Sequence, residues 1–276
     1  MTAAVFQQKH ELWLQCLFTS FMVEEAGLKA ELYDFSQMLF RHMRWIVREL
    51  KAAGLDYTYD RRGELGRFET VFDALQALQA GIETAMASYP ASTLAERIIT
   101  DERYLLSRLA HWLEHPRYDA PVTAFGRHRT LSGKTLDRAQ TDALTLFLFE
   151  ETYKEYELIL IYAYMQNGSD DVHERDVYQD LIDESHYHLK SFGNLMAQMG
   201  ILALPRPLHE RTYRIEDVDA FIRNGIDEEE NAKEQCRALS EAVKDEELSA
   251  FFDFINYQES YHIELMKKLL DQSFPK

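Results

Sequence analysis

The sequence predicts an all-α protein made of two four-helix bundles in tandem. Apolar residues make up 46% of its 276 residues, whereas only 11 are glycine and 6 are proline. This composition disfavours both disorder and turn-rich β architecture. The prolines lie outside the segments in which apolar residues recur every three or four positions, because proline is excluded from helix interiors.

This periodicity predicts eight helices, four in each half of the chain. The first four are expected at residues 5–26, 29–52, 67–88 and 92–114, and the second four at 137–166, 172–199, 215–242 and 246–272. Residues 117–136 contain proline and glycine without a helical period, so they predict a linker between an N-terminal bundle (1–116) and a C-terminal bundle (137–272). One irregular helical domain is the alternative.

Charge and cysteine content exclude several classes of protein. A net charge of −17 disfavours nucleic acid and anionic membranes as partners. Cys16 and Cys236 lie far apart in helix-like segments, which gives no support for a disulfide framework or a cysteine metal site. The first residues lack the pattern of a signal peptide, and the apolar run at residues 158–165 is shorter than the roughly 20 residues that span a bilayer. We therefore expect a cytoplasmic protein.

Charged residues interrupt the apolar stripes of the last two predicted helices. Glu259 and His262 share the stripe that includes Phe252, Ile255 and Met266, so they form an inward Glu-x-x-His. On the preceding helix, Glu229 occupies the apolar stripe. Folding this hairpin about residue 245 brings Glu229 level with the Glu259 and His262 pair.

The other hairpin of the C-terminal half predicts a matching set. Glu151 and Glu155 lie on the stripe of one helix, and Glu184 and His188 on that of the next. Folding about residue 168 places Glu151 level with residues 184–187. An unpaired carboxylate in an apolar interior costs several kcal/mol or gives up its charge, and divalent cations remove that cost. Carboxylate oxygen with imidazole nitrogen suits iron, manganese or zinc. A buried hydrogen-bond network without metal is the alternative.

The Glu and Glu-x-x-His pattern, given twice, resembles the ligand pattern of the ferritin-like dimetal-carboxylate superfamily. The segment 226–270, with its Lys-Asp-Glu-Glu turn, is similar to the second hairpin of rubrerythrin-like domains, and the likeness covers residues 137–272. The resemblance implies a ferritin-like four-helix bundle that binds two iron ions, or alternatively manganese. The implied metal ligands are Glu151, Glu184, His188, Glu229, Glu259 and His262.

One position departs from the family pattern. Tyr187 stands where histidine would complete the motif that Glu184 begins. We prefer the register Glu184 and His188, which keeps His188 on the inward stripe. Asp183 with His186 is the other register, and Glu155 is a further ligand that could replace one of those named.

The N-terminal half matches the ligand pattern only in part. Leu39 precedes His42 where glutamate is expected, Gln79 stands in place of an inward glutamate, and Leu105 follows Glu102 where histidine is expected. We therefore expect a degenerate N-terminal bundle that has lost the ligand pattern and binds no metal. Its expected role is packing, dimerisation or forming one wall of a substrate pocket.

The resemblance implies a non-haem dimetal oxidoreductase that activates dioxygen or peroxide as its small-molecule substrate. The chain has no Cys-x-x-Cys module, so a separate electron donor is expected, and we expect a homodimer. The alternatives are an iron-handling protein without turnover and a metal-free interaction protein. Several tyrosines near the expected ligands either pack in the core or hydrogen-bond to ligands and relay electrons. These are Tyr153, Tyr156, Tyr162, Tyr164, Tyr187 and Tyr261.

Overall fold

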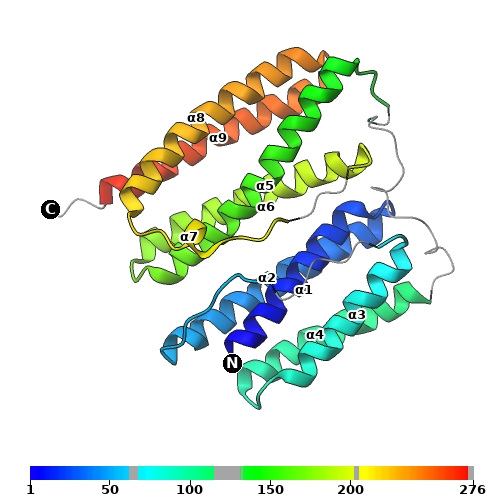
Figure 1. Cartoon of the computed structure of the whole chain (residues 1–276), viewed down its shortest axis with the longest axis vertical. Coiled ribbons are helices and arrows are strands. Elements are labelled where there is room, and N and C mark those ends of the chain that lie inside the picture. Colours follow the sequence, from blue (N-terminus) through cyan, green and yellow to red (C-terminus); the bar gives the residue numbers. More distant parts are fainter. Residues whose placement is uncertain (62–67, 115–130, 132, 202–204, 273–276) are drawn as a thin grey trace. The chain divides into compact units, whose positions relative to one another are not determined.

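A computed structural model describes residues 1–61, 68–114, 131, 133–201 and 205–272. The described chain is helical, which confirms the predicted all-α class (Figure 1). Within these residues no helix combines the length and apolar composition needed to cross a bilayer. The helices are α1 (Ala3–Met22), α2 (Ala26–Ala52), α3 (Val71–Ser88), α4 (Thr93–Leu113), α5 (Arg138–Gly168), α6 (Val172–Gln198), α7 (Glu210–Tyr213), α8 (Val218–Val243) and α9 (Glu246–Gln272).

Side-chain caps set the starts of the long helices. Ser92 accepts a hydrogen bond from the N–H of Ala95, and Asp137 forms a capping box with Gln140. The predicted first helix was too long. It ends at Met22 rather than residue 26, because the Glu25 side chain accepts from the N–H groups of Gly27 and Leu28 and so starts α2. The short helix α7 was not predicted.

Contacts between Cα atoms divide the chain into two compact units. Unit 1 comprises residues 1–127 with the segment 200–210, and unit 2 comprises residues 128–199 with 211–276. The segment 200–210, which the sequence pattern assigned to the C-terminal bundle, is therefore grouped with the N-terminal helices. Most of the predicted linker, residues 117–136, lies outside the described residues.

In unit 2 the hairpin α5–α6 packs against the hairpin α8–α9, with α5 on α8 and α6 on α9. The Gln140 side chain at the start of α5 donates to the carbonyl of Ala242 at the end of α8, so these two helices are antiparallel. Hydrogen bonds from Gln258 to Glu184 and from Tyr261 to Asp180 show that α6 and α9 are antiparallel too. Consequently α6 ends and α8 begins at opposite ends of unit 2.

Unit 1 follows the same path. The hairpin α1–α2 packs on the hairpin α3–α4, with α1 on α3 and α2 on α4. Ser88 near the end of α3 bonds to Gln8 near the start of α1, and Arg108 of α4 bonds to Glu31 of α2, so these neighbours are antiparallel. The two units share one connectivity, although their buried polar residues differ.

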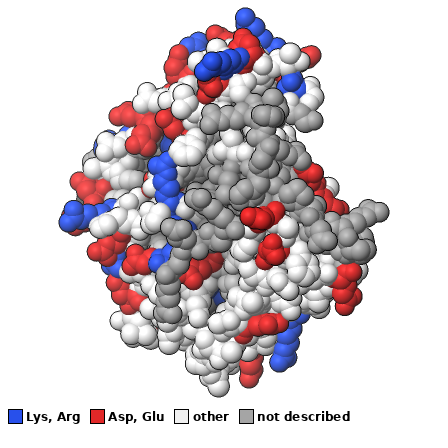
Figure 2. Space-filling model, turned by 45° about the vertical axis from the view of Figure 1, so that its right-hand side comes forward, with Lys and Arg blue, Asp and Glu red and all other residues white. Residues whose placement is uncertain are grey.

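The surface reflects the excess of acidic residues, 47 Asp and Glu against 30 Lys and Arg. On the face drawn in Figure 2, acidic side chains are spread over the described surface among scattered basic ones. Four glutamates of unit 2 are buried instead, namely Glu151, Glu155, Glu229 and Glu259.

Candidate metal centre

Each long helix of unit 2 buries at least one ionisable side chain near its middle. Glu155 of α5, His188 of α6, Glu229 of α8, and Glu259 and His262 of α9 each expose 3% or less of their surface. The apolar stripe of α9 is buried as predicted, from Leu248 to Leu269, and it carries Glu259 and His262 into the core. Helix periodicity, rather than loop geometry, therefore positions these side chains.

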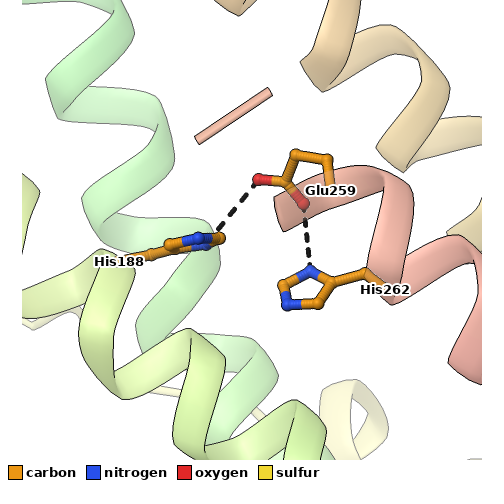
Figure 3. Close-up of side chains that lie close together, drawn as sticks. All are labelled: His188, Glu259 and His262. Atoms are coloured by element: carbon orange, nitrogen blue, oxygen red, sulfur yellow. Dashed lines mark ion pairs between the residues drawn. The ribbon is translucent and has the colours of Figure 1, made fainter. Parts of the chain in front are cut away.

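Glu259 lies between two histidines (Figure 3). Its Oε1 is 3.6 Å from Nδ1 of His188, and its Oε2 is 3.0 Å from Nδ1 of His262. One donor atom from each of the three residues lies within 4.8 Å of the others. Glu259 thus offers one oxygen to each histidine, which is how a carboxylate bridges two ions.

These distances suit metal ligation. Ligand nitrogen and oxygen atoms lie about 2 Å from such ions, so two donors on one ion are at most about 4 Å apart. Both contacts of Glu259 fall within that limit. Each histidine with one Glu259 oxygen can therefore share an ion without large movement of the helices.

Further polar contacts extend this cluster on the α6 side. His188 Nδ1 is 2.9 Å from Oε1 of Glu155, and its Nε2 is 3.2 Å from Oε1 of Gln258. Gln258 also donates to Oε2 of Glu184, 2.8 Å away. Glu184 lies 3.8 Å from Nε2 of His262, and its side chain, 26% exposed, is the most accessible carboxylate of the set. Although burial disfavours the imidazolium, Glu155 and Glu259 raise the pKa of His188 to about 9.

Glu229 and Glu259 form a coupled carboxyl pair. Burial and the neighbouring Glu259 raise the pKa of Glu229 well above its usual range, whereas hydrogen bonds from His262 and Glu229 outweigh burial and lower the pKa of Glu259. Without metal, Glu229 therefore holds the proton and Glu259 carries the charge. Glu229 Oε1 is 4.0 Å from Nδ1 of His262.

Glu151 completes the set on α5, where it is 7% exposed. Burial raises its pKa to about 7, with Lys154 opposing this shift and Glu155 and Glu259 adding to it. Lys154 is the nearby cation. Burial disfavours its ammonium, but Glu229, Glu151, Glu155 and Glu259 together raise its pKa. The sequence pattern had offered no basic partner, since Lys154 is not on the apolar stripe.

The geometry favours one of the two registers proposed for α6. His188 reaches the cluster, whereas Nδ1 of His186 lies 2.9 Å from the carbonyl oxygen of Ile182 on its own helix. Asp183 is exposed and accepts a hydrogen bond from Gln179. Tyr187, the residue at the departing motif position, is 42% exposed.

Unit 1 buries a different polar group. Lys9 and Glu102 are fully buried and form an ion pair, and the Tyr89 hydroxyl donates to Glu102 at 2.9 Å. Burial lowers the pKa of Lys9 and raises that of Glu102, so the pair carries no net charge whichever partner holds the proton. His42, also buried, contacts Asp101 at 3.0 Å.

Sequence reasoning missed Lys9, Lys154 and Gln258. Long side chains reach a buried group from a position beside the stripe, so periodicity alone does not reveal them. Gln258 immediately precedes Glu259, and Lys154 immediately precedes Glu155. A polar residue flanking a buried carboxylate in sequence is the only signal that could have pointed to these two.

A scan against protein-family models, a search of curated proteins and a search of solved structures found no match to this chain. The functional interpretation therefore depends on the residues of unit 2 alone.

Proposed function

We propose that unit 2 is a ferritin-like carboxylate bundle that binds two iron ions, with manganese as the alternative metal. Charge supports this proposal above all. Five carboxylates gather here against one lysine, and they are Glu151, Glu155, Glu184, Glu229 and Glu259. Two divalent ions together with Lys154 balance these five negative charges while both histidines remain neutral ligands.

The donor set also fits two ions better than one. Glu259 has one oxygen near each histidine, so His188 and His262 would hold different ions and Glu259 would be shared between them. Glu155 lies beside His188, and Glu184 and Glu229 lie beside His262. Each ion would then have a histidine and at least one carboxylate of its own. Mixed carboxylate and imidazole ligands suit iron and manganese.

We further propose that the protein is a non-haem dimetal oxidoreductase that acts on dioxygen or peroxide. When bound, a pair of redox-active ions supplies the electron transfer that this chemistry requires. The chain's own residues hold and orient that pair, because Gln258 bonds to both His188 and Glu184 and fixes their side chains. Glu184, partly exposed, marks the side from which a small molecule or a proton reaches the centre.

Metal analysis is the decisive experiment. Elemental mass spectrometry of the purified protein, with the absorption spectrum recorded before and after dithionite, should give about two iron or manganese ions per chain. No metal after anaerobic reconstitution with ferrous ion would contradict the proposal. It would leave a hydrogen-bonded network neutralised by Lys154, His188 and shared protons, and would favour a metal-free interaction protein.

Turnover separates an oxidoreductase from an iron-handling protein. The metal-loaded protein should consume hydrogen peroxide repeatedly when a chemical reductant replaces the separate electron donor, with its metal content unchanged. A single stoichiometric reaction followed by accumulation or release of iron would indicate metal handling instead.

A further inference from the structure

Tyr162 lies in the core of unit 2, on the same stripe of α5 as Glu155. It is 1% exposed and two helical turns beyond Glu155, a rise of about 10 Å along the axis. Glu155 and Tyr162 are seven residues apart, so they share one face of α5. Its ring stacks on that of Tyr178, with centroids 6.5 Å apart.

The hydroxyl of Tyr162 has no hydrogen-bond partner in the described part of the chain, although it is shielded from solvent. Buried polar groups are almost always hydrogen-bonded, and an unsatisfied one commonly marks the place of a bound water, ion or ligand. Leaving a hydroxyl unpaired in an apolar interior is costly. An acceptor supplied from outside the chain removes that cost.

Carboxylates of the cluster act electrostatically on this hydroxyl. Burial raises the pKa of Tyr162 well above its usual range, and the charges of Glu229, Glu155 and Glu259 raise it further. The phenol is therefore protonated at any physiological pH and acts as a donor. The partner that it lacks is an acceptor.

We propose that Tyr162 donates a hydrogen bond to a small oxygen-containing ligand, water at rest or peroxide in turnover, that binds beside Glu155, Glu229 and Glu259. The assignment rests on the proposed metal centre and deepens it, because it names a residue of the chain that would hold a ligand bound there. It also sets the ligand class. The acceptor is a small polar molecule, since Tyr162 and its surroundings are buried.

The test compares Tyr162→Phe with Tyr178→Phe, which removes the hydroxyl of the stacked neighbour. The carboxylates near Tyr178 are Glu174 and Asp219 rather than those of the cluster. Azide, a small anion that accepts hydrogen bonds, is titrated into the metal-loaded proteins and followed by absorption. Tyr162→Phe should weaken azide binding about threefold to tenfold, the effect of one hydrogen bond, with metal content unchanged. Tyr178→Phe should leave azide affinity as in the wild type.

Thermal unfolding of the metal-free proteins gives a readout that does not depend on the loaded centre. Because the Tyr162 hydroxyl lacks a protein partner, Tyr162→Phe should unfold at or above the wild-type temperature. A drop of about 2–4 °C, the loss expected for a hydrogen bond within the protein, would overturn the assignment.

The outcomes also separate this assignment from the proposed function. If the wild-type protein binds no metal, both proposals are wrong. If the wild-type protein binds metal but no azide, or if both variants bind azide as tightly as each other, Tyr162 has no role in ligand binding. The proposed metal centre is unaffected by that result.

Discussion

Units 1 and 2 have the same connectivity but neutralise their buried carboxylates differently. In unit 1, Glu102 of α4 pairs with Lys9 of α1, and Tyr89 completes the group. In unit 2, Glu259 of α9 lies among further carboxylates, with Lys154 as the nearby lysine. Unit 1 therefore pairs its buried carboxylate with one lysine, whereas the carboxylates of unit 2 outnumber the nearby lysine.

This difference is the basis for proposing a metal site in unit 2 and none in unit 1. A buried ion pair with matched charges is already neutral and needs no added proton or cation. A core with more carboxylates than cationic side chains must instead hold protons or bind cations. The shifted pKa values agree, since those of Glu229 and Glu151 lie above the usual range of a glutamate. The two units have the same topology, so the proposal that unit 2 binds metal rests on the charge balance of its core.

The largest effect expected is loss of metal from unit 2 variants alone. Glu259→Ala or His262→Ala should abolish metal occupancy because each removes a ligand at the centre of the cluster. His42→Ala in unit 1 should keep the full metal content. Elemental mass spectrometry measures the metal, and circular dichroism should show nearly unchanged helix content. The exposed Glu264 on α9 provides a matched control, Glu264→Ala, which should bind metal normally. Loss of metal from the His42 variant would reverse the assignment of the two units.

Breaking the ion pair of unit 1 should have the largest effect on stability. Lys9→Met leaves Glu102 buried without its cation, which costs about 3–5 kcal/mol. Metal content should stay unchanged. Urea unfolding of the metal-free protein, followed by circular dichroism, measures the loss.

The double variant Lys9→Met with Glu102→Gln is the control for this pair. Glutamine removes the unpaired charge and still accepts the hydrogen bond from Tyr89, so most of the lost stability should return. If the double variant is no more stable than Lys9→Met, the cost lies in packing rather than charge.

The two units should respond to pH in opposite directions. In unit 2 without metal, the pKa values of Glu151, about 7, and His188, about 9, lie above the ordinary values of 4.5 and 6.5 for these side chains. The stability from these groups is complete below the unfolded values and is lost as pH rises through the folded ones. In unit 1, burial lowers the pKa of His10 to about 3 and of His42 to about 4. Their contribution is complete above 6.5 and is lost as pH falls through these values.

Glu151→Gln tests the unit 2 part of this prediction, because glutamine mimics the protonated side chain at every pH. Between pH 5 and pH 8, the metal-free variant should lose less stability than the wild type, by on the order of 2–3 kcal/mol. Thermal unfolding at both pH values measures the difference. Glu150→Gln, at an exposed position on the same helix, should behave as the wild type. Parallel pH dependence in all three proteins would show that Glu151 is ionised in the folded state.

How far the sequence predicts the structure depends on the amphipathicity of each helix. In α9 the buried side chains Phe252, Ile255, Glu259 and His262 lie where the apolar period places them, because the opposite face is polar. In α1 most residues are buried, so the apolar period does not separate a buried face from an exposed one. It therefore does not identify Lys9 as buried. Its partner Glu102 is distant in sequence, and only the tertiary fold brings them together.

Local chemistry also competed with periodicity at particular positions. Glu25 fits the inward stripe of an extended first helix, yet its carboxylate caps α2 instead. Gln258 and Lys154 flank the buried carboxylates in sequence and affect them through long side chains. These residues shape the electrostatics of the centre, and the apolar pattern that locates its ligands carries no information about them.

The smallest effect is expected at His186, the histidine of the alternative register. Its Nδ1 lies 2.9 Å from the carbonyl oxygen of Ile182, which turns the ring toward its own helix. His186→Gln should therefore cost about 1 kcal/mol from one lost buried hydrogen bond, and metal content should remain as in the wild type. His188→Gln, two residues further along α6, should lose metal, because His188 contacts both Glu155 and Glu259. Elemental mass spectrometry of the two variants decides the register. If His186→Gln loses metal and His188→Gln retains it, the alternative register is correct. In that register α6 presents Asp183 and His186 to the centre, and His188, on the other side of Tyr187, only packs beside it.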